Sequence, residues 1–359
     1  MRKLFLATLF FSFATLSYAK KDKATYSDLV FCIDMSGSAR GVFDSFKNMY
    51  WKMVNEAQIK AGNKILRIGI IGYSRNSFSA DSGYVKIFAQ PSENFDQTFL
   101  TFCGIKTYIE GGTQMIGVLI DVATKRIEWS KTSGSSRAII IIGNGSVRLG
   151  KINYKAAVIA AKRKGIAIHG LYLQAGKNRN IEEWQQLADR SGTQLFASKL
   201  NDTSCFNSVA LDSFRIANTT FNNHLIYYGE NGKTNFDNLV VADNLTPDYG
   251  LNDRYSFKAR IVSGEASAHW ELISHYNNGD FDLMNIDREK LPFQFQTLVA
   301  EQMLETIRNK SKERDTDLRS FKEIVGRMPL NEINYQPLDD KSYRLNAAMI
   351  MILRDALSH

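Results

Sequence analysis

Apolar residues in the first half of the chain occur in two alternating patterns. Short, mainly apolar runs, which predict strands, cover residues 29–33, 66–73, 85–88, 138–142, 166–173 and 194–197. Apolar residues spaced three and four apart, which predict helices with one buried face, cover residues 42–57, 115–127, 153–164 and 181–190. Gly62 and Gly192 follow two of these helical segments and are placed to end them.

The run at residues 138–142, an alanine followed by four isoleucines, is the most strand-like and shows no polar alternation. Such a run predicts a strand buried on both faces, as in a parallel sheet. Strands that alternate with helices predict a doubly wound α/β domain, with a mostly parallel sheet flanked by helices. Ligands of such domains bind beyond the carboxyl ends of the strands, where the strand order reverses. We therefore expect the functional residues in the loops after Ile33 and Ile142.

The second half of the chain has a different pattern. Four of the five prolines lie there, and residues 206–230, 298–319 and 347–357 have helical spacing. Apolar stripes of this kind are more typical of a helical core than of a partner groove. We predict an α/β domain at residues 26–204, followed by a mainly helical region at residues 205–359 that resembles no family known to us.

The first 19 residues have the pattern of a secretory signal peptide. Met1, Arg2 and Lys3 precede an apolar run of about ten residues, and a small-residue step ends at Ala19. No later stretch reaches the roughly 18 apolar residues of a transmembrane helix. We expect an exported protein, periplasmic or secreted, with no transmembrane segment.

Composition and charge exclude several classes of protein. With 44% hydrophobic and 23% charged residues, the chain is neither disordered, nor collagen-like, nor a disulfide scaffold. Residues 26–200 hold 23 basic and 13 acidic side chains, whereas residues 201–359 hold 17 and 23. We expect the acidic half to dock on the basic half. Nucleic acid is not an expected partner, because residues 162–164 form the one short basic cluster.

Cysteine and histidine spacing gives no zinc site. Cys32 lies inside an apolar run, where a buried structural thiol is the simpler interpretation. Whether Cys103 and Cys205 pair is left open, because sequence does not fix connectivity. His169 lies within a predicted strand and is expected to be a satisfied core or edge residue.

The loop after the first strand carries candidate metal ligands. Asp34, Ser36 and Ser38 alternate on a loop that contains Gly37, so that three oxygens can face one point. Mg²⁺ prefers oxygen ligands of this kind, with water completing an octahedron. The alternative is a simple turn that caps the following helix.

Two further loops decide between these readings. Residues 110–114 (EGGTQ) precede a predicted helix, and Gly143, Asn144 and Gly145 follow the strongest strand. In these three loops, and in the order of its elements over about residues 26–200, the chain resembles the von Willebrand factor type A domain with its metal-ion-dependent adhesion site. The resemblance implies metal coordination by five residues of this chain: Asp34, Ser36, Ser38, Thr113 and Asn144.

The third loop departs from the family pattern, which has an aspartate where this chain has Asn144. The site then holds one formal negative charge, from Asp34, and its affinity for Mg²⁺, Mn²⁺ or Ca²⁺ should fall, since charge count sets that affinity. A partner protein that offers a carboxylate would supply the missing charge.

Three functions remain open. The first is a binding module that grips a protein or surface ligand with the help of a divalent cation. The second is a structural or assembly protein whose degenerate site works without metal. The third is a metal-dependent hydrolase, for which Glu110 is the one further carboxylate near these loops. We expect no enzymatic activity, because the usual second acid is missing.

Overall fold

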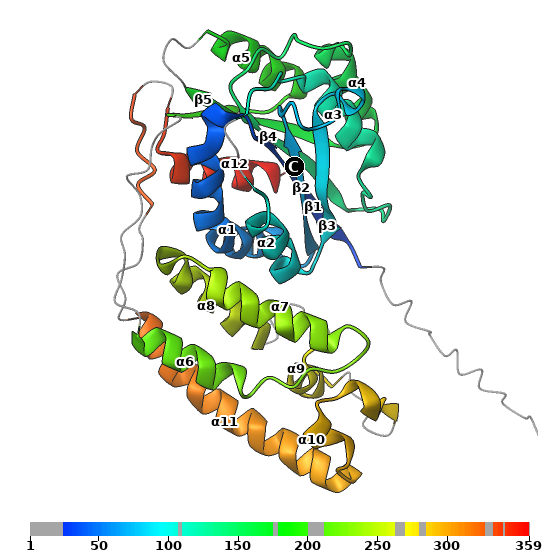
Figure 1. The fold of residues 1–359 in the computed structure, drawn as a ribbon, viewed down its shortest axis with the longest axis vertical. Coiled ribbons are helices and arrows are strands. Elements are labelled where there is room, and N and C mark those ends of the chain that lie inside the picture. The colour runs from blue at the N-terminus through cyan, green and yellow to red at the C-terminus, as the bar shows by residue number, and fades with distance from the viewer. Residues whose placement is uncertain are drawn as a thin grey trace, which may run out of the picture.

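The computed structural model describes residues 24–106, 110–174, 179–199, 212–262, 270–279, 285–326, 333–339 and 342–358. The expected signal peptide at residues 1–19 and Cys205 lie outside the described residues. An α/β domain lies above a helical region in Figure 1.

The described residues contain a six-stranded sheet with the order β3-β2-β1-β4-β5-β6. Its strands are β1 (Tyr26–Asp34), β2 (Ile65–Tyr73), β3 (Val85–Ser92), β4 (Ser136–Gly143), β5 (Ala167–Gln174) and β6 (Leu195–Lys199). All neighbours pair in parallel except β2 and β3, which are antiparallel. The strand order reverses between β1 and β4, so ligand-binding loops are expected at their carboxyl ends.

Helices cover both faces of the sheet (Figure 1). Phe31 and Ile33 of β1 face α1 (Arg40–Ala61), α2 (Phe95–Cys103) and α12 (Leu345–Ala356). Val30 and Cys32 face α3 (Ile116–Arg126), α4 (Tyr154–Arg163) and α5 (Ile181–Ser191). The apolar run within β4 is buried on both sides. The predicted fold class is confirmed.

Helix α2 is absent from the sequence prediction. Its buried phenylalanines, Phe95, Phe99 and Phe102, have helical spacing, and the side chain of Asn94 accepts a hydrogen bond from the amide of Gln97 (3.0 Å) at the start of the helix. The helix has only nine residues and follows β3 after two residues. Its short length hid a pattern that the longer helices display over several turns.

Helix α12 packs on the sheet although the helical region separates it from β6 in sequence (Figure 1). Inside the fold, Nδ1 of the buried His169 on β5 lies 2.9 Å from Oδ2 of Asp355 on α12. The amide of Tyr343, just before α12, donates to the carbonyl of Ala197 on β6 (2.9 Å). His169 is therefore a core residue, as one of the two expectations had it, and its Nδ1 is paired with Asp355.

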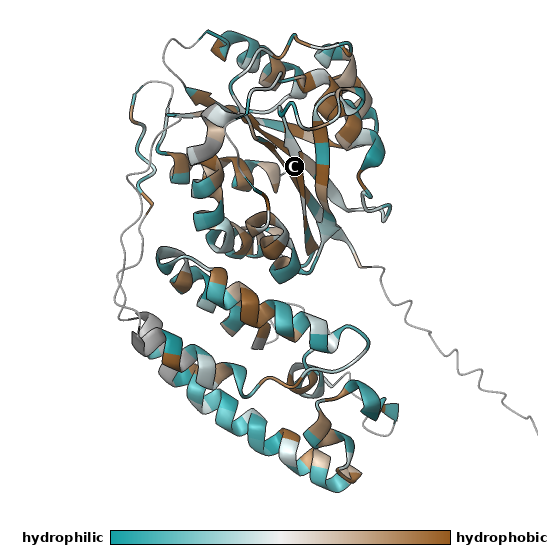
Figure 2. Cartoon of the chain, viewed as in Figure 1, coloured by the Kyte–Doolittle hydropathy of each residue, from teal (hydrophilic) through white to brown (hydrophobic). Residues whose placement is uncertain are grey.

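The helical region comprises α6 (Asp212–Asn222), α7 (Gly232–Leu245), α8 (Leu251–Val262), α9 (Leu272–Asn277), α10 (Phe293–Gln296) and α11 (Ala300–Gly326). Helices α7 and α8 lie nearest the α/β domain, and α6 and α11 lie side by side beyond them (Figure 1). Figure 2 shows much of α11 to be hydrophilic. Within the described residues, no helix has both the length and the apolar character needed to span a bilayer.

The cysteines that the structure describes, Cys32 and Cys103, are both free. Cys32 is buried in β1, as expected. Burial also raises the pKa of Cys103 to about 11, so this thiol is protonated at neutral pH.

A buried group of charges joins the helical region to the α/β domain. Arg254 of α8 places Nη1 2.6 Å from Oδ1 of Asp96 on α2, and Nε 2.8 Å from Oδ1 of Asp243 on α7. Its guanidinium also lies 4.1 Å from the ring centre of Trp51 on α1. Burial acts to raise the pKa of Asp243, but the charges of Lys258 and Arg254 outweigh it and hold that pKa well below its usual range. Arg254 therefore connects α8 with three other helices.

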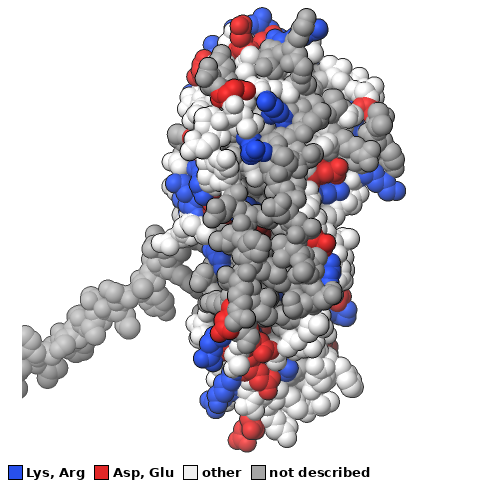
Figure 3. Space-filling view, turned by 90° about the vertical axis from the view of Figure 1, so that its left-hand side faces the viewer, with Lys and Arg blue, Asp and Glu red and all other residues white. Residues whose placement is uncertain are grey.

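The opposite net charges of the two halves of the chain do not account for the ion pairs between them. In two ion pairs that join residues 26–200 to residues 201–359, Arg254 with Asp96 and Arg354 with Glu56, the basic partner comes from the acidic half of the chain. On the face drawn in Figure 3, basic and acidic side chains are interspersed rather than gathered in one patch. Docking of the acidic half on the basic half stays a prediction.

Arg254→Ala should lower the free energy of unfolding by about 3 to 5 kcal/mol, because Asp96 and Asp243 would lose their buried cation. Arg215→Ala is the control: it removes a 3.3 Å pair with Asp248 in which both side chains are 49% exposed. That pair should contribute less than about 1 kcal/mol. Urea unfolding measures both losses, and equal losses would contradict the assigned role of Arg254.

Candidate functional site

The candidate site lies where the strand order reverses. Asp34 is the last residue of β1 and is fully buried, and Asn144 directly follows β4. Ile33 pairs with Ile142, so Asp34 lies one residue and Asn144 two residues beyond this pair, at the same edge of the sheet. The loop that precedes α3 approaches them from a different part of the chain.

The side-chain amide of Gln114, in the loop before α3, lies between these two residues. Its Nε2 donates to Oδ2 of Asp34 and to Oδ1 of Asn144, the latter at 3.0 Å. Its Oε1 accepts from the backbone amides of Asn144 (3.3 Å) and Gly145 (2.6 Å). We call these four hydrogen bonds the amide bridge. It joins all three loops through one buried, uncharged group.

Two glycines allow the loops of the site to pack closely. A Cβ at Gly145 would lie 2.6 Å from Cδ of Gln114, so a side chain there would displace the glutamine. A Cβ at Gly112 would collide with the backbone carbonyl of Ser74, beyond the end of β2. Glycine is needed at both positions because backbone and side chain approach closely.

Helix α5 fixes the loop after β4 from the other side. Asn180 donates to the carbonyl of Asn144 (2.9 Å), and the indole of Trp184 donates to the carbonyl of Gly145 (2.8 Å). Glu183 accepts from the hydroxyl of Ser146 at 2.6 Å. The polar groups of this loop are thereby paired, which holds it in one conformation.

The start of the α3 loop is held by Glu110. Its carboxylate accepts hydrogen bonds from Nε and Nη2 of Arg75 (3.0 and 2.9 Å) and from the amide and hydroxyl of Ser77. Its carbonyl accepts from the amide of Gly37 in the first loop (2.9 Å). Slight burial acts to raise the pKa of Glu110, but the bonds from Ser77 and Arg75 lower it below its usual value. Glu110 is thus a poor proton acceptor at neutral pH.

Asp34 supplies the negative charge of the site. Burial raises its pKa to about 6, although hydrogen bonds from Ser36 and Gln114 act to lower it. The carboxylate is therefore mostly ionised at neutral pH. The amide of Ser36 donates to Oδ1 at 2.9 Å, and the amide bridge occupies Oδ2. Hydrogen bonds from neutral groups stabilise this charge.

The family model of the von Willebrand factor type A domain (VWA) matches residues 28–210, just over half of the chain. The chain belongs to this family. The matched residues include all six strands and the three loops of the candidate site. No curated protein matches the sequence.

Several solved structures resemble this VWA domain. BatB, a conserved hypothetical protein from Bacteroides thetaiotaomicron, is 17% identical over 48% of this chain and 90% of its own, with a TM-score of 0.37. An aerotolerance-related membrane protein from Bacteroides fragilis is 17% identical, with 49% and 93% covered and a TM-score of 0.37. For the pilus adhesin SpaC from Lactobacillus rhamnosus GG, the identity is 15%, the covered shares are 49% and 28%, and the TM-score is 0.37.

The VWA fold brings some of the predicted metal ligands together. Asp34 and Asn144 share the amide of Gln114, and the amide of Ser36 binds Asp34. Thr113 is exposed, whereas its neighbour Gln114 is buried. Ser38 belongs to a short 3₁₀ turn at Gly37–Ala39, and its side chain lies outside the described part of the structure.

This arrangement does not fit a divalent cation. A cation needs oxygen lone pairs that point at it, but one oxygen of Asp34 and the side-chain oxygen of Asn144 accept N–H groups from Gln114. Within the described residues, no group of three or more His, Cys, Asp or Glu side chains could hold a metal ion, so a cation at these loops would depend on hydroxyl and amide oxygens beside Asp34. Sequence reasoning missed Gln114 because the family pattern directs attention to Thr113 beside it.

Gln114→Met keeps the length of the side chain but removes the amide bridge. It should lower the free energy of unfolding by about 2 to 3 kcal/mol, because the buried oxygen of Asp34 and the amides of Asn144 and Gly145 lose their partner. The matched control is Thr113→Val at the exposed neighbour, which should change it by less than about 0.5 kcal/mol. Thermal and urea melts measure both, and an unaffected Gln114→Met protein would refute a structural role for the bridge.

Proposed function

We propose that this protein is a binding module that holds a partner protein on the loops at the carboxyl ends of β1 and β4, without a resident metal ion. The absence of a resident metal ion from this proposal rests on the amide bridge. Gln114 supplies N–H groups to the acceptors that a cation would otherwise contact. The expected pattern at residues 1–19 supports an encounter with the partner outside the cytoplasm.

The exposed rim of these loops suits a binding surface. Gly111, Gly112 and Thr113 are exposed, and they are followed by the buried Gln114. Hydrogen bonds from α5 and from Arg75 hold the flanking segments. A surface fixed before binding loses less conformational entropy when it meets a partner, which favours affinity.

Cation-assisted binding is the second candidate, because the family site usually works with a metal. Departure of the Gln114 side chain would free the oxygens of Asp34 and Asn144, leaving a site with one carboxylate. Its cation affinity should be weak for that reason. Hydrolysis has less support, since the carboxylate of Glu110 is bound by Arg75 and Ser77.

The two binding hypotheses differ in their response to cations. Residues 20–359 should melt at the same temperature, within about 1 °C, in EDTA and in about 5 mM Mg²⁺, Mn²⁺ or Ca²⁺, because only a ligand of the native state shifts the midpoint. The double variant Gln114→Ala, Asn144→Asp removes the bridge and adds a carboxylate, so Mg²⁺ or Mn²⁺ should raise its midpoint by several degrees. A rise in the wild type that Asp34→Ala abolishes would instead establish cation-assisted binding.

Partner binding at the loops can be tested by photo-crosslinking. The reactive residue p-benzoylphenylalanine would replace the exposed Thr113 or, as control, the exposed Arg163 at the far end of α4. In an envelope extract from the source organism, position 113 should give an adduct of one defined mass, equally in EDTA and in Mg²⁺. No adduct at 113, or the same adducts at 163, would count against a binding surface there.

A further inference from the structure

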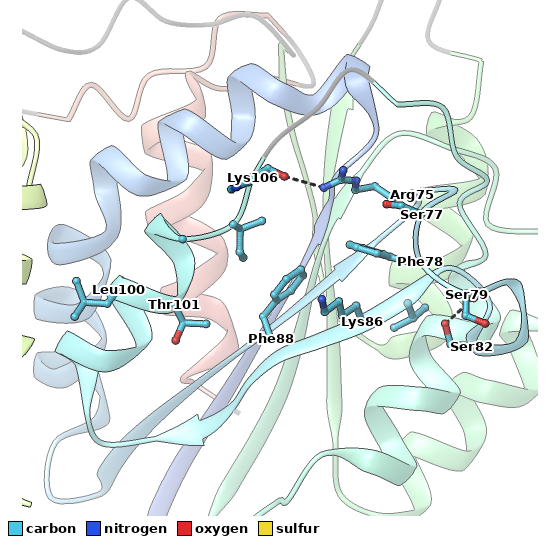
Figure 4. A pocket seen from close by; sticks show the side chains of 13 residues that line it. Arg75, Ser77, Phe78, Ser79, Ser82, Lys86, Phe88, Leu100, Thr101 and Lys106 are labelled. Atoms are coloured by element: carbon cyan, nitrogen blue, oxygen red, sulfur yellow. Dashed lines mark hydrogen bonds between the residues drawn. The ribbon is translucent and has the colours of Figure 1, made fainter. Parts of the chain in front are cut away.

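A cavity that is separate from the amide bridge opens beside the VWA loops. Its volume is about 730 Å³, within the range of roughly 300 to 1,000 Å³ typical of small-molecule sites. The residues that follow β2, the start of β3 and the end of α2 line it (Figure 4). Asp34, Gln114 and Asn144 are not among its described lining residues.

Two phenylalanines form the apolar wall of this cavity. The rings of Phe78 and Phe88 are 5.9 Å apart, centre to centre, and meet edge to face at 63°. Ile105, which is buried, also lines the cavity. The side chains of Phe78, Phe88 and Lys86 point toward one another in Figure 4. A flat or flexible apolar group of a ligand can be buried against this wall.

The charged residues described in the lining of the cavity are all basic. Arg75, Lys86 and Lys106 line it, and its described lining residues include no carboxylate. Arg75 is balanced by its ion pair with Glu110, at 2.9 Å. The ammonium of Lys86 lies 5.1 Å from the ring centre of Phe88 and has no carboxylate partner among the described residues. The exposed Lys86 therefore leaves a net positive charge next to the aromatic wall.

The hydroxyls of the cavity already have partners within the chain. Ser77 donates to Glu110 (2.9 Å), Ser82 donates to the carbonyl of Ser79 (2.7 Å) and Thr101 donates to the carbonyl of Gln97 (2.9 Å). Among the described lining residues, these three hydroxyls donate within the chain, which leaves the ammonium groups of Lys86 and Lys106 as the charged groups for an anion. A lysine acts as a point charge and can pair with one anionic group of a ligand.

We propose that this cavity binds a small organic carboxylate. Its apolar body, an aromatic ring or a short aliphatic chain, lies against Phe78 and Phe88, and its carboxylate faces the ammonium of Lys86. The proposed ligand contacts, Lys86 and Phe88, belong to β3 and take no part in the amide bridge. Arg75 and Ser77 of the cavity lining also hold Glu110 at the start of the α3 loop, so the cavity adjoins the partner-binding loops.

Calorimetric titration of residues 20–359 with 2-naphthoate and octanoate tests the proposal. At least one of them should bind, and the uncharged analogue, 2-naphthamide or octanamide, should bind at least tenfold more weakly, since only the acid pairs with Lys86. Lys86→Gln should weaken binding of the acid at least tenfold, and a melt should show that this exposed substitution leaves the fold intact. Lys155→Gln, at an exposed position on α4, is the matched control and should bind like the wild type.

Three results would overturn the proposal. They are the absence of binding by either acid at about 5 mM, equal binding of acid and amide, and unchanged binding in Lys86→Gln. A phosphate monoester, phenyl phosphate, should bind more weakly than the carboxylates, and tighter binding of it would show that the anionic group has been wrongly assigned.

Discussion

A parallel sheet with two apolar faces has to be shielded from water on both sides, and the rest of this molecule is arranged around that constraint. On one face, α3, α4 and α5 follow the strands in the usual alternation of the chain. The other face is covered by α1 and α2 from the first half and by α12 from the far side of the helical region. Because α1 and α2 also contact α8 and α7, the shielding of the sheet and the attachment of the helical region involve the same helices.

The chain stabilises its buried carboxylates in two different ways. Asp96 and Asp243 have Arg254 and Lys258 as cationic partners, so the helix junction is ionic and depends on close geometry. Asp34 has no such cation in the described structure and is held instead by backbone and side-chain N–H groups. Lys258 and Arg254 together lower the pKa of Asp243, whereas at Asp96 burial outweighs the charge of Arg254 and raises the pKa of that carboxyl, as burial does at Asp34. Buried ion pairs thus stabilise the helix junction, whereas the buried carboxylate of Asp34 has no cation beside it among the described residues.

Much of the α/β domain could be predicted from sequence because its strands are short and mainly apolar and four of its helices are long enough to show their period. The three loops of the candidate site could be predicted for the same reason, since each adjoins a strand or helix with a clear pattern. The amide bridge could not, because glutamine is a common surface residue and its burial depends on the glycine at position 145 in a distant loop. The packing of α12 could not be predicted either. The apolar pattern of a helix indicates that the helix is buried, but it does not indicate which surface buries it. The sequence predicted that His169 lies in a strand, but its pairing with Asp355 could be found only in the folded structure.

The position of α12 also bears on the order in which the protein can fold. The ribosome completes β4, β5 and β6 long before it reaches residues 345–356, and it makes the entire helical region in between. During that interval part of one sheet face has no covering helix, and contacts between residues so far apart in sequence form slowly. Exposed apolar surface in a partly made chain favours aggregation or capture by a chaperone. The α/β domain, although it lies near the start of the sequence, therefore matures only after the helical region has been synthesised.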